Sequence, residues 1–218
     1  MLKLADIILS TEKSFKNLLE SFFLTVYPRE NLPSHNIDHH RRVWEYAKEL
    51  LKYKEKDGFC FDRPFIQKLI IGCFLHDIGM AIDPGERHGR HSRELCVRFL
   101  KENNMNESEY SDLLAAVENH DDKEYAAAGN KDLLLTLLSV ADDLDAFGEE
   151  GIERYLEIYR ERGVDEKKIG QAICDNAEKR FRNFENLFLK YPELLEKHRI
   201  RYVELIDHFK KNIVLNKA

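Results

Sequence analysis

The chain has 218 residues, of which 43% are hydrophobic and 34% are charged, and its formal net charge is −6 at pH 7. This length fits a single domain, and the low content of glycine and proline argues against a disordered or all-β chain. The acidic balance argues against non-specific binding to nucleic acid, which requires a basic surface. No apolar run reaches the 18 residues that a membrane-spanning helix needs, so we expect no membrane association.

Apolar residues recur at intervals of three and four along the chain, which is the period of amphipathic helices. Asn106, Asp165 and Pro192 are typical of helix starts. No segment alternates as a half-buried strand does, so the predicted fold class is all-α. The predicted helices cover residues 3–26, 38–56, 64–77, 89–103, 107–120, 131–146, 149–161, 165–190 and 192–214.

The cysteines and the N-terminal sequence bear on the compartment. Cys60, Cys73, Cys96 and Cys174 are scattered and form no C-x-x-C pair, which predicts free thiols and argues against a zinc–thiolate site. The opening sequence MLKLADIILSTEKSF has too short an apolar run, and a charge too early, for a signal peptide. We therefore expect a cytoplasmic protein.

Several imidazoles and carboxylates lie on helix faces that should be buried. A buried ionised group costs free energy unless it is paired or bound to a metal, and groups gathered around a divalent cation satisfy one another. Nitrogen and oxygen ligands suit Mn, Fe, Zn, Co or Ni, although a polar network without metal is an alternative. The residues concerned are His39, His76, Asp77, His120 and Asp142.

Three short segments resemble the signature of the HD-domain metal-dependent phosphohydrolases. They are H-x-x-R-V at His39, H-D-I-G at His76 and Asp77, and A-D-x-L at Asp142, in this order and on predicted helices. The resemblance implies a helical bundle with a central metal whose ligands are these four residues. His40 is the nearest rival of His39, and the H-x-x-R-V spacing favours His39.

The resemblance covers about residues 30–150 and leaves the C-terminal helices unexplained. We expect one domain over residues 1–218, with this HD-type core and the helices of about 150–215 packed on it. A homodimer is compatible with the sequence, which does not fix the oligomeric state.

Some members of this family hold two metals, and the chain has candidates for the additional ligands. The segment H-G-R-H-S-R-E-L points to His88, with His91 one turn later as a substitute, and V-E-N-H supplies His120. In that interpretation Asp77 bridges the two ions. The residues after His120, DDKEY, depart from the pattern of the branch that cleaves cyclic dinucleotides.

The implied reaction is hydrolysis, by a metal-activated water, of a phosphoester or phosphoanhydride in a nucleotide or small phosphorylated metabolite. The cofactor would be one or two divalent ions, with Mg as a further candidate. Asp77 would orient the ions or the water, and His35 would protonate a leaving group, contact phosphate or only help to close its loop. Candidates for phosphate binding, because arginine forks match phosphate oxygens, are Arg41, Arg42, Arg87, Arg90 and Arg93.

Two other functions fit the same residues. An HD-type di-iron oxygenase would use the same six ligands, and its iron content and oxygen consumption would identify it. A non-catalytic module that senses a ligand would show no turnover with any metal.

Overall fold

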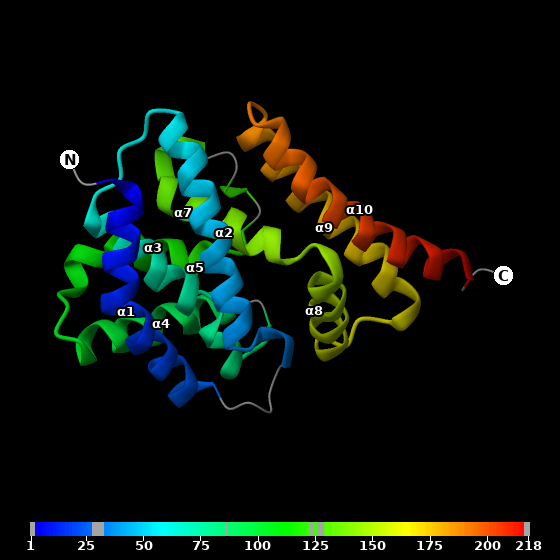
Figure 1. The fold of residues 1–218 in the computed structure, drawn as a ribbon. Coiled ribbons are helices and arrows are strands. Elements are labelled where there is room, and N and C mark those ends of the chain that lie inside the picture. Colours follow the sequence, from blue (N-terminus) through cyan, green and yellow to red (C-terminus); the bar gives the residue numbers. More distant parts are fainter. Residues whose placement is uncertain (1–2, 28–32, 86, 123, 126–128, 216–218) are drawn as a thin grey trace. The chain divides into compact units, whose positions relative to one another are not determined.

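The computed structural model describes residues 3–27, 33–85, 87–122, 124–125 and 129–215, and the helices dominate these residues (Figure 1). The predicted all-α fold class is confirmed, and the described residues contain no strand. The α-helices are α1 (Leu4–Val26), α2 (Ile37–Lys56), α3 (Arg63–Leu75), α4 (His88–Glu102), α5 (Ser111–Asn119), α7 (Leu133–Asp145), α8 (Gly148–Glu161), α9 (Glu166–Phe188) and α10 (Pro192–Leu215). Short 3₁₀ helices are η1 (Pro33–His35), η2 (Ile78–Ala81), η3 (Glu107–Tyr110) and η4 (Gly129–Asp132).

The chain divides into two compact units, residues 1–141 and residues 142–218. Helix α7 runs from the first unit into the second, and the boundary falls just before Asp142. The expected single domain, with the C-terminal helices packed on the core, stays a prediction.

Helix α3 is the centre of the first unit. Its second half, residues 69–75, is apolar on every side, and residues such as Leu69, Ile70 and Phe74 are fully buried. A helix of this kind must be covered on every side, and α1, α2 and α5 pack against it. Helix α4 packs against α5 and η2. Polar side chains at the end of α3 therefore have a protein interior around them.

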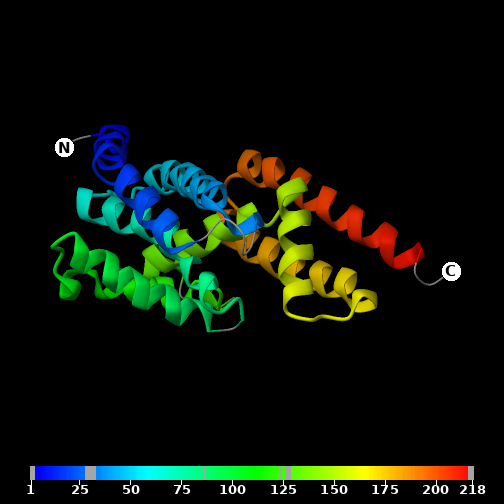
Figure 2. The same ribbon diagram turned by 90° about the horizontal axis from the view of Figure 1, so that it is seen from below.

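The second unit is built on an antiparallel pair of helices, α9 and α10, which lie side by side in both views (Figures 1 and 2). Only residues 189–191 separate the two helices, and so short a connection returns the chain alongside itself. Phe184 is fully buried between them, and Phe181 stacks on Tyr202 with ring centroids 4.5 Å apart. Helix α8 packs on both α9 and α10.

Candidate metal centre

The first two histidines of the site stand in the first turn of α2. Asn36 begins this helix, since its side chain accepts a hydrogen bond of 2.8 Å from the Asp38 N–H. The cap fixes where the helix starts and therefore which faces His39 and His40 occupy. Both histidines are fully buried.

His76 and Asp77 come where α3 ends and the chain enters η2. Asp62 caps the start of α3 by accepting a hydrogen bond from the Phe65 N–H, and Leu75 is the last helical residue. We predicted that the helix continues to residue 77. The structure instead ends it two residues earlier, because the Met80 N–H donates to the Asp77 carbonyl and forms a tighter turn. The side chains of His76 and Asp77 are 0% and 6% exposed.

Two glycines let α4, which begins at His88, pack closely on its neighbours: Gly79 at this turn and Gly89 against α5. A Cβ atom on Gly79 would lie 2.2 Å from the His88 carbonyl oxygen and 2.4 Å from the Ser92 nitrogen. A Cβ atom on Gly89 would lie 2.4 Å from the Glu118 carbonyl oxygen. No larger residue fits at either position without moving the backbone. The glycine of the H-D-I-G segment thus lets His88 approach Asp77.

Backbone carbonyls orient three of the imidazoles. The Nδ1 atoms of His76, His88 and His120 lie 3.1, 2.7 and 2.8 Å from the carbonyl oxygens of Cys73, Gly85 and Val117. Because a carbonyl oxygen can only accept a hydrogen bond, each Nδ1 carries a proton. In a neutral imidazole the lone pair is then on Nε2.

The Nε2 atoms of four histidines converge on the carboxylate of Asp77, two on each oxygen. Oδ1 lies 2.9 Å from Nε2 of His120 and 3.4 Å from Nε2 of His88. Oδ2 lies 3.4 Å from Nε2 of His76 and 3.5 Å from Nε2 of His39. Each pair of histidines therefore faces its own oxygen of Asp77, an arrangement in which the carboxylate could bridge two ions.

The buried carboxylate of Asp77 depends on positive charge or hydrogen-bond donors supplied by its surroundings. Burial opposes ionisation of Asp77, yet the positive charge of His76 and hydrogen bonds from His120, His39 and His76 hold its pKa well below the usual range. Burial lowers the pKa of His88, although the charge of Asp77 opposes this. The Nε2 atoms of His39 and His76 are 3.2 Å apart. So close an approach of lone pairs to one another and to a carboxylate is unfavourable unless protons or a metal supply positive charge.

The separations also fit ligands around a metal. Bonds of about 2.0–2.2 Å to nitrogen and oxygen place neighbouring ligand atoms roughly 3–3.5 Å apart. The distances around Asp77 span this range. Two groups of buried side chains have the required convergence, one with His39, His76 and Asp77 and the other with Asp77, His88 and His120.

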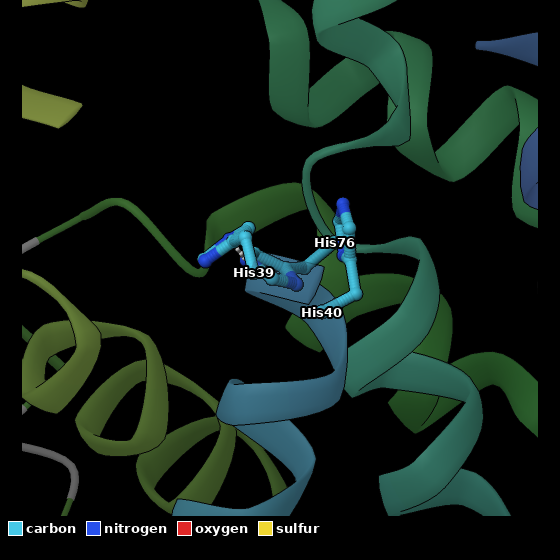
Figure 3. Close-up of side chains that lie close together, drawn as sticks. All are labelled: His39, His40 and His76. Carbon is cyan, nitrogen blue, oxygen red and sulfur yellow. Dashed lines mark hydrogen bonds between the residues drawn. The ribbon is translucent and has the colours of Figure 1, made fainter. Parts of the chain in front are cut away.

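His40 lies beside the first group (Figure 3). His39, His40 and His76 each offer a ring nitrogen within 4.8 Å of the others. His40 Nδ1 lies 3.2 Å from the Cys73 carbonyl oxygen, the same acceptor that orients His76. Its Nε2 has no hydrogen-bond partner within the part of the chain that the structure describes, and burial lowers its pKa well below the usual value. His40 is therefore a neutral imidazole that packs beside His39 and His76.

Asp142 is the first residue of the second unit, and its role as a metal ligand stays a prediction. It is buried in α7, and both of its oxygens accept from arginines of the same unit. Arg154 Nη2 lies 3.2 Å from Oδ1, and Arg180 Nη1 lies 3.1 Å from Oδ2. Arg154 also pairs with Asp145, and Arg180 with Asp143.

Sequence reasoning missed both of these arginines. The sequence feature that could have identified them is an arginine on an otherwise apolar helix face. Arg154 stands four residues before the buried Ile158, and Arg180 stands four residues before Phe184. A charged residue on the buried face of an amphipathic helix needs a partner inside the protein, just as His39 does.

The other histidines named from the sequence lie in different surroundings. His91 is 23% exposed, and its Nδ1 lies 3.5 Å from Glu94, so the structure brings His88 to Asp77 and leaves His91 on the outer side. His35 is buried in η1, where its ring centroid is 5.7 Å from that of His39 and its Nδ1 is 3.0 Å from the Ser34 hydroxyl. The catalytic role of His35 stays a prediction.

The arginines predicted to bind phosphate are mainly at the surface. Arg87 pairs with Asp83 and Arg90 with Glu94, with 78% and 70% of their side chains exposed. Arg41 forms a fork on Glu20, which raises its pKa, and Arg93 pairs with Glu118. Arg42 is half-buried on α2. Their binding of phosphate stays a prediction.

Comparison with known proteins identifies the family. The model of the HD domain matches residues 36–146, which is just over half of the chain. A structural-genomics protein of Lactobacillus plantarum, known from a crystal structure, superposes with a TM-score of 0.54 and 16% sequence identity, covering 100% of this chain and 97% of that one. At this identity the similarity concerns the fold alone. A search of the curated proteins found no match.

The described residues contain no helix that combines the length and the apolar character needed to cross a membrane.

The segment that matches the HD-domain model includes the histidines and Asp77 of the buried cluster, and also Asp142. A buried cluster of histidine and aspartate within such a segment is typical of a metal site. The chain belongs to the HD-domain family.

Proposed function

We propose that the protein is a metal-dependent phosphohydrolase that acts on a phosphoester or phosphoanhydride of a nucleotide or small phosphorylated metabolite. The observation that carries the proposal is the convergence of four Nε2 atoms on the two oxygens of Asp77. Together with membership of the HD family, this favours metal-assisted hydrolysis over other chemistry.

The donor set fits one or two divalent ions. His39 and His76 would hold one ion with Oδ2 of Asp77, and His88 and His120 would hold the other with Oδ1. The family signature implies Asp142 as a further ligand. Imidazole and carboxylate together suit Mn, Fe, Co, Ni or Zn, and Mg is a weaker candidate because it prefers oxygen ligands. When bound, such ions lower the pKa of water and stabilise negative charge on phosphate oxygens.

The residues of the chain would orient the reactants. The Cys73, Gly85 and Val117 carbonyls fix the tautomers of His76, His88 and His120, so these imidazoles accept no proton from the reacting water while they are ligands. The attacking water would release one proton to solvent, and its oxygen would form the new bond to phosphorus as the bond to the leaving oxygen breaks. His35, buried beside His39, is the candidate that would donate the proton to the leaving group.

The test combines metal content with turnover. We would measure ions per chain by plasma mass spectrometry on protein purified without chelator, and then assay a panel of nucleotides and an aryl phosphodiester. The proposal predicts bound metal and hydrolysis, both lost in Asp77→Ala. Metal without hydrolysis of any substrate on the panel would contradict it.

The same ligands support one alternative, a di-iron oxygenase, since His88 and His120 complete a six-ligand set. Iron as the retained metal, with oxygen consumed and no phosphate released, would establish the alternative. A folded protein that binds ligand without turnover would instead be a sensing module. We further propose a cytoplasmic location and a small phosphorylated partner.

A further inference from the structure

The second unit contains a compact network of three buried carboxylates and two arginines. Asp142, Asp143 and Asp145 come from α7, Arg154 comes from α8 and Arg180 from α9. The side chains of the two arginines are 9% and 12% exposed, and those of the aspartates are at most 4% exposed. Charges this deeply placed interact strongly, because little water screens them.

Each arginine has one carboxylate of its own and shares Asp142 with the other. Arg154 Nη1 donates to Asp145 and its Nη2 donates to Asp142, at 3.1 and 3.2 Å. Arg180 Nη1 donates to both Asp143 and Asp142. Asp143 and Asp145 therefore fix the orientation of the two guanidinium groups independently of Asp142.

The shared carboxylate is the predicted metal ligand. A carboxylate that binds a divalent cation gives up much of its charge to that cation, so its attraction for the guanidinium groups weakens. The arginines would remain in place on Asp143 and Asp145, but each would have lost part of an anionic contact. A buried guanidinium in that state favours a new anion, and its planar fork suits the oxygens of phosphate.

We propose that Arg154 and Arg180 bind a phosphate group of the substrate, and that a divalent cation at Asp142 opens their guanidinium groups to it. This inference rests on the proposed function, since it takes Asp142 as a ligand. By linkage, the cation and the phosphate must raise each other's affinity by the same factor. It also assigns a role to the C-terminal helices, which the family signature does not cover.

The test is calorimetric titration of inorganic phosphate into the full-length chain, either loaded with Mn²⁺ and desalted or stripped with chelator. We expect the loaded protein to bind phosphate at least tenfold more tightly than the stripped protein. Arg154→Gln and Arg180→Gln should each weaken phosphate binding to the loaded protein at least tenfold while Mn²⁺ per chain is unchanged. Arg182→Gln is the matched control, because Arg182 is on the same helix in an exposed pair with Glu178, and it should change neither quantity.

The outcomes separate this inference from the proposed function. Wild-type protein that takes up no cation would overturn both. Loaded variants that bind phosphate as tightly as the wild type, or stripped protein that binds it as tightly as loaded protein, would overturn only the inference. If a glutamine variant does not fold, Arg154→Lys and Arg180→Lys keep the charge but lose the fork. They should then weaken phosphate binding severalfold, and unchanged binding would overturn the inference equally.

Discussion

The two units stabilise their buried carboxylates in different ways. In the first unit, one carboxylate is surrounded by four imidazoles, three of which are oriented by backbone carbonyls. In the second unit, three carboxylates are paired with two guanidinium groups that are always charged. The first cluster lacks a permanent positive charge, and the second has it built in. The cluster around Asp77 therefore depends on bound protons or a cation for its positive charge, whereas the carboxylates of the second unit have arginine partners within the protein.

The largest effect is expected from Asp77. Asp77→Asn keeps the shape of the side chain but removes the charge that both groups of histidines share, so every bound ion should be lost. Asp112→Ala is the control, since Asp112 forms an exposed pair with Lys68. Plasma mass spectrometry gives the metal content, and far-ultraviolet circular dichroism verifies the helical fold. Full metal content in folded Asp77→Asn would contradict the view that the Asp77 carboxylate holds the ions of the first unit.

A matched pair of neighbours on α2 tests which histidine is the ligand. His39→Ala should remove the ion held on the His39 side, because its Nε2 faces Oδ2 of Asp77. His40→Phe should keep the metal content, because His40 packs against Phe23 with ring centroids 4.5 Å apart. The same metal analysis decides between them. Loss of metal in His40→Phe with retention in His39→Ala would reverse the assignment.

His88 and His120 should each be required for the binding of one ion only. His88→Ala or His120→Ala removes a ligand from Oδ1 of Asp77, so we expect about half of the wild-type metal content, with the other ion retained. His91→Ala should leave the content unchanged. Equal content in wild type, His88→Ala and His120→Ala would mean that the site holds a single ion.

The smallest effect on metal content is expected from Gly79→Ala. The added methyl group would meet the backbone of His88 and Ser92, so α4 must shift, at a cost of about 1–3 kcal/mol in the free energy of unfolding. His88 would move with it, and the affinity for the second ion should fall. In Gly72→Ala the methyl group meets only leucine side chains at 3.3 Å, which can adjust. Denaturant titrations of the two variants give the comparison, and equal stability would show that the close approach is not required.

Much of the fold could be predicted because the period of the apolar residues is strong in most helices. Helix α1 spans Leu4–Val26 where we predicted 3–26, and α10 begins at Pro192 as predicted. The segment 107–120 was predicted as one helix, and the structure divides it into η3 and α5. Asn106 accepts from the Ser108 N–H, which favours a tight first turn there.

The candidate site was predictable in part. Polar residues on apolar faces indicated His39, His76 and Asp77, and the structure gathers them. The choice between His88 and His91 depends on the rotation of α4 about its axis. The close contacts of Gly79 and Gly89 determine this rotation, and no local sequence pattern predicts it. Arg154 and Arg180 were missed because α8 and α9 are rich in charged residues. In such helices the sequence does not distinguish one arginine that faces inward from many that face solvent.

The central claim is that Asp77 bridges two ions. The most direct measurement is anomalous diffraction at the manganese edge from crystals of protein loaded with Mn²⁺. The account predicts two peaks about 3.5–4 Å apart, one on each side of the Asp77 carboxylate. The peak near Oδ2 should lie beside His39 and His76, and the peak near Oδ1 beside His88 and His120. Fully loaded crystals with no peak within bonding distance of Asp77 would contradict it.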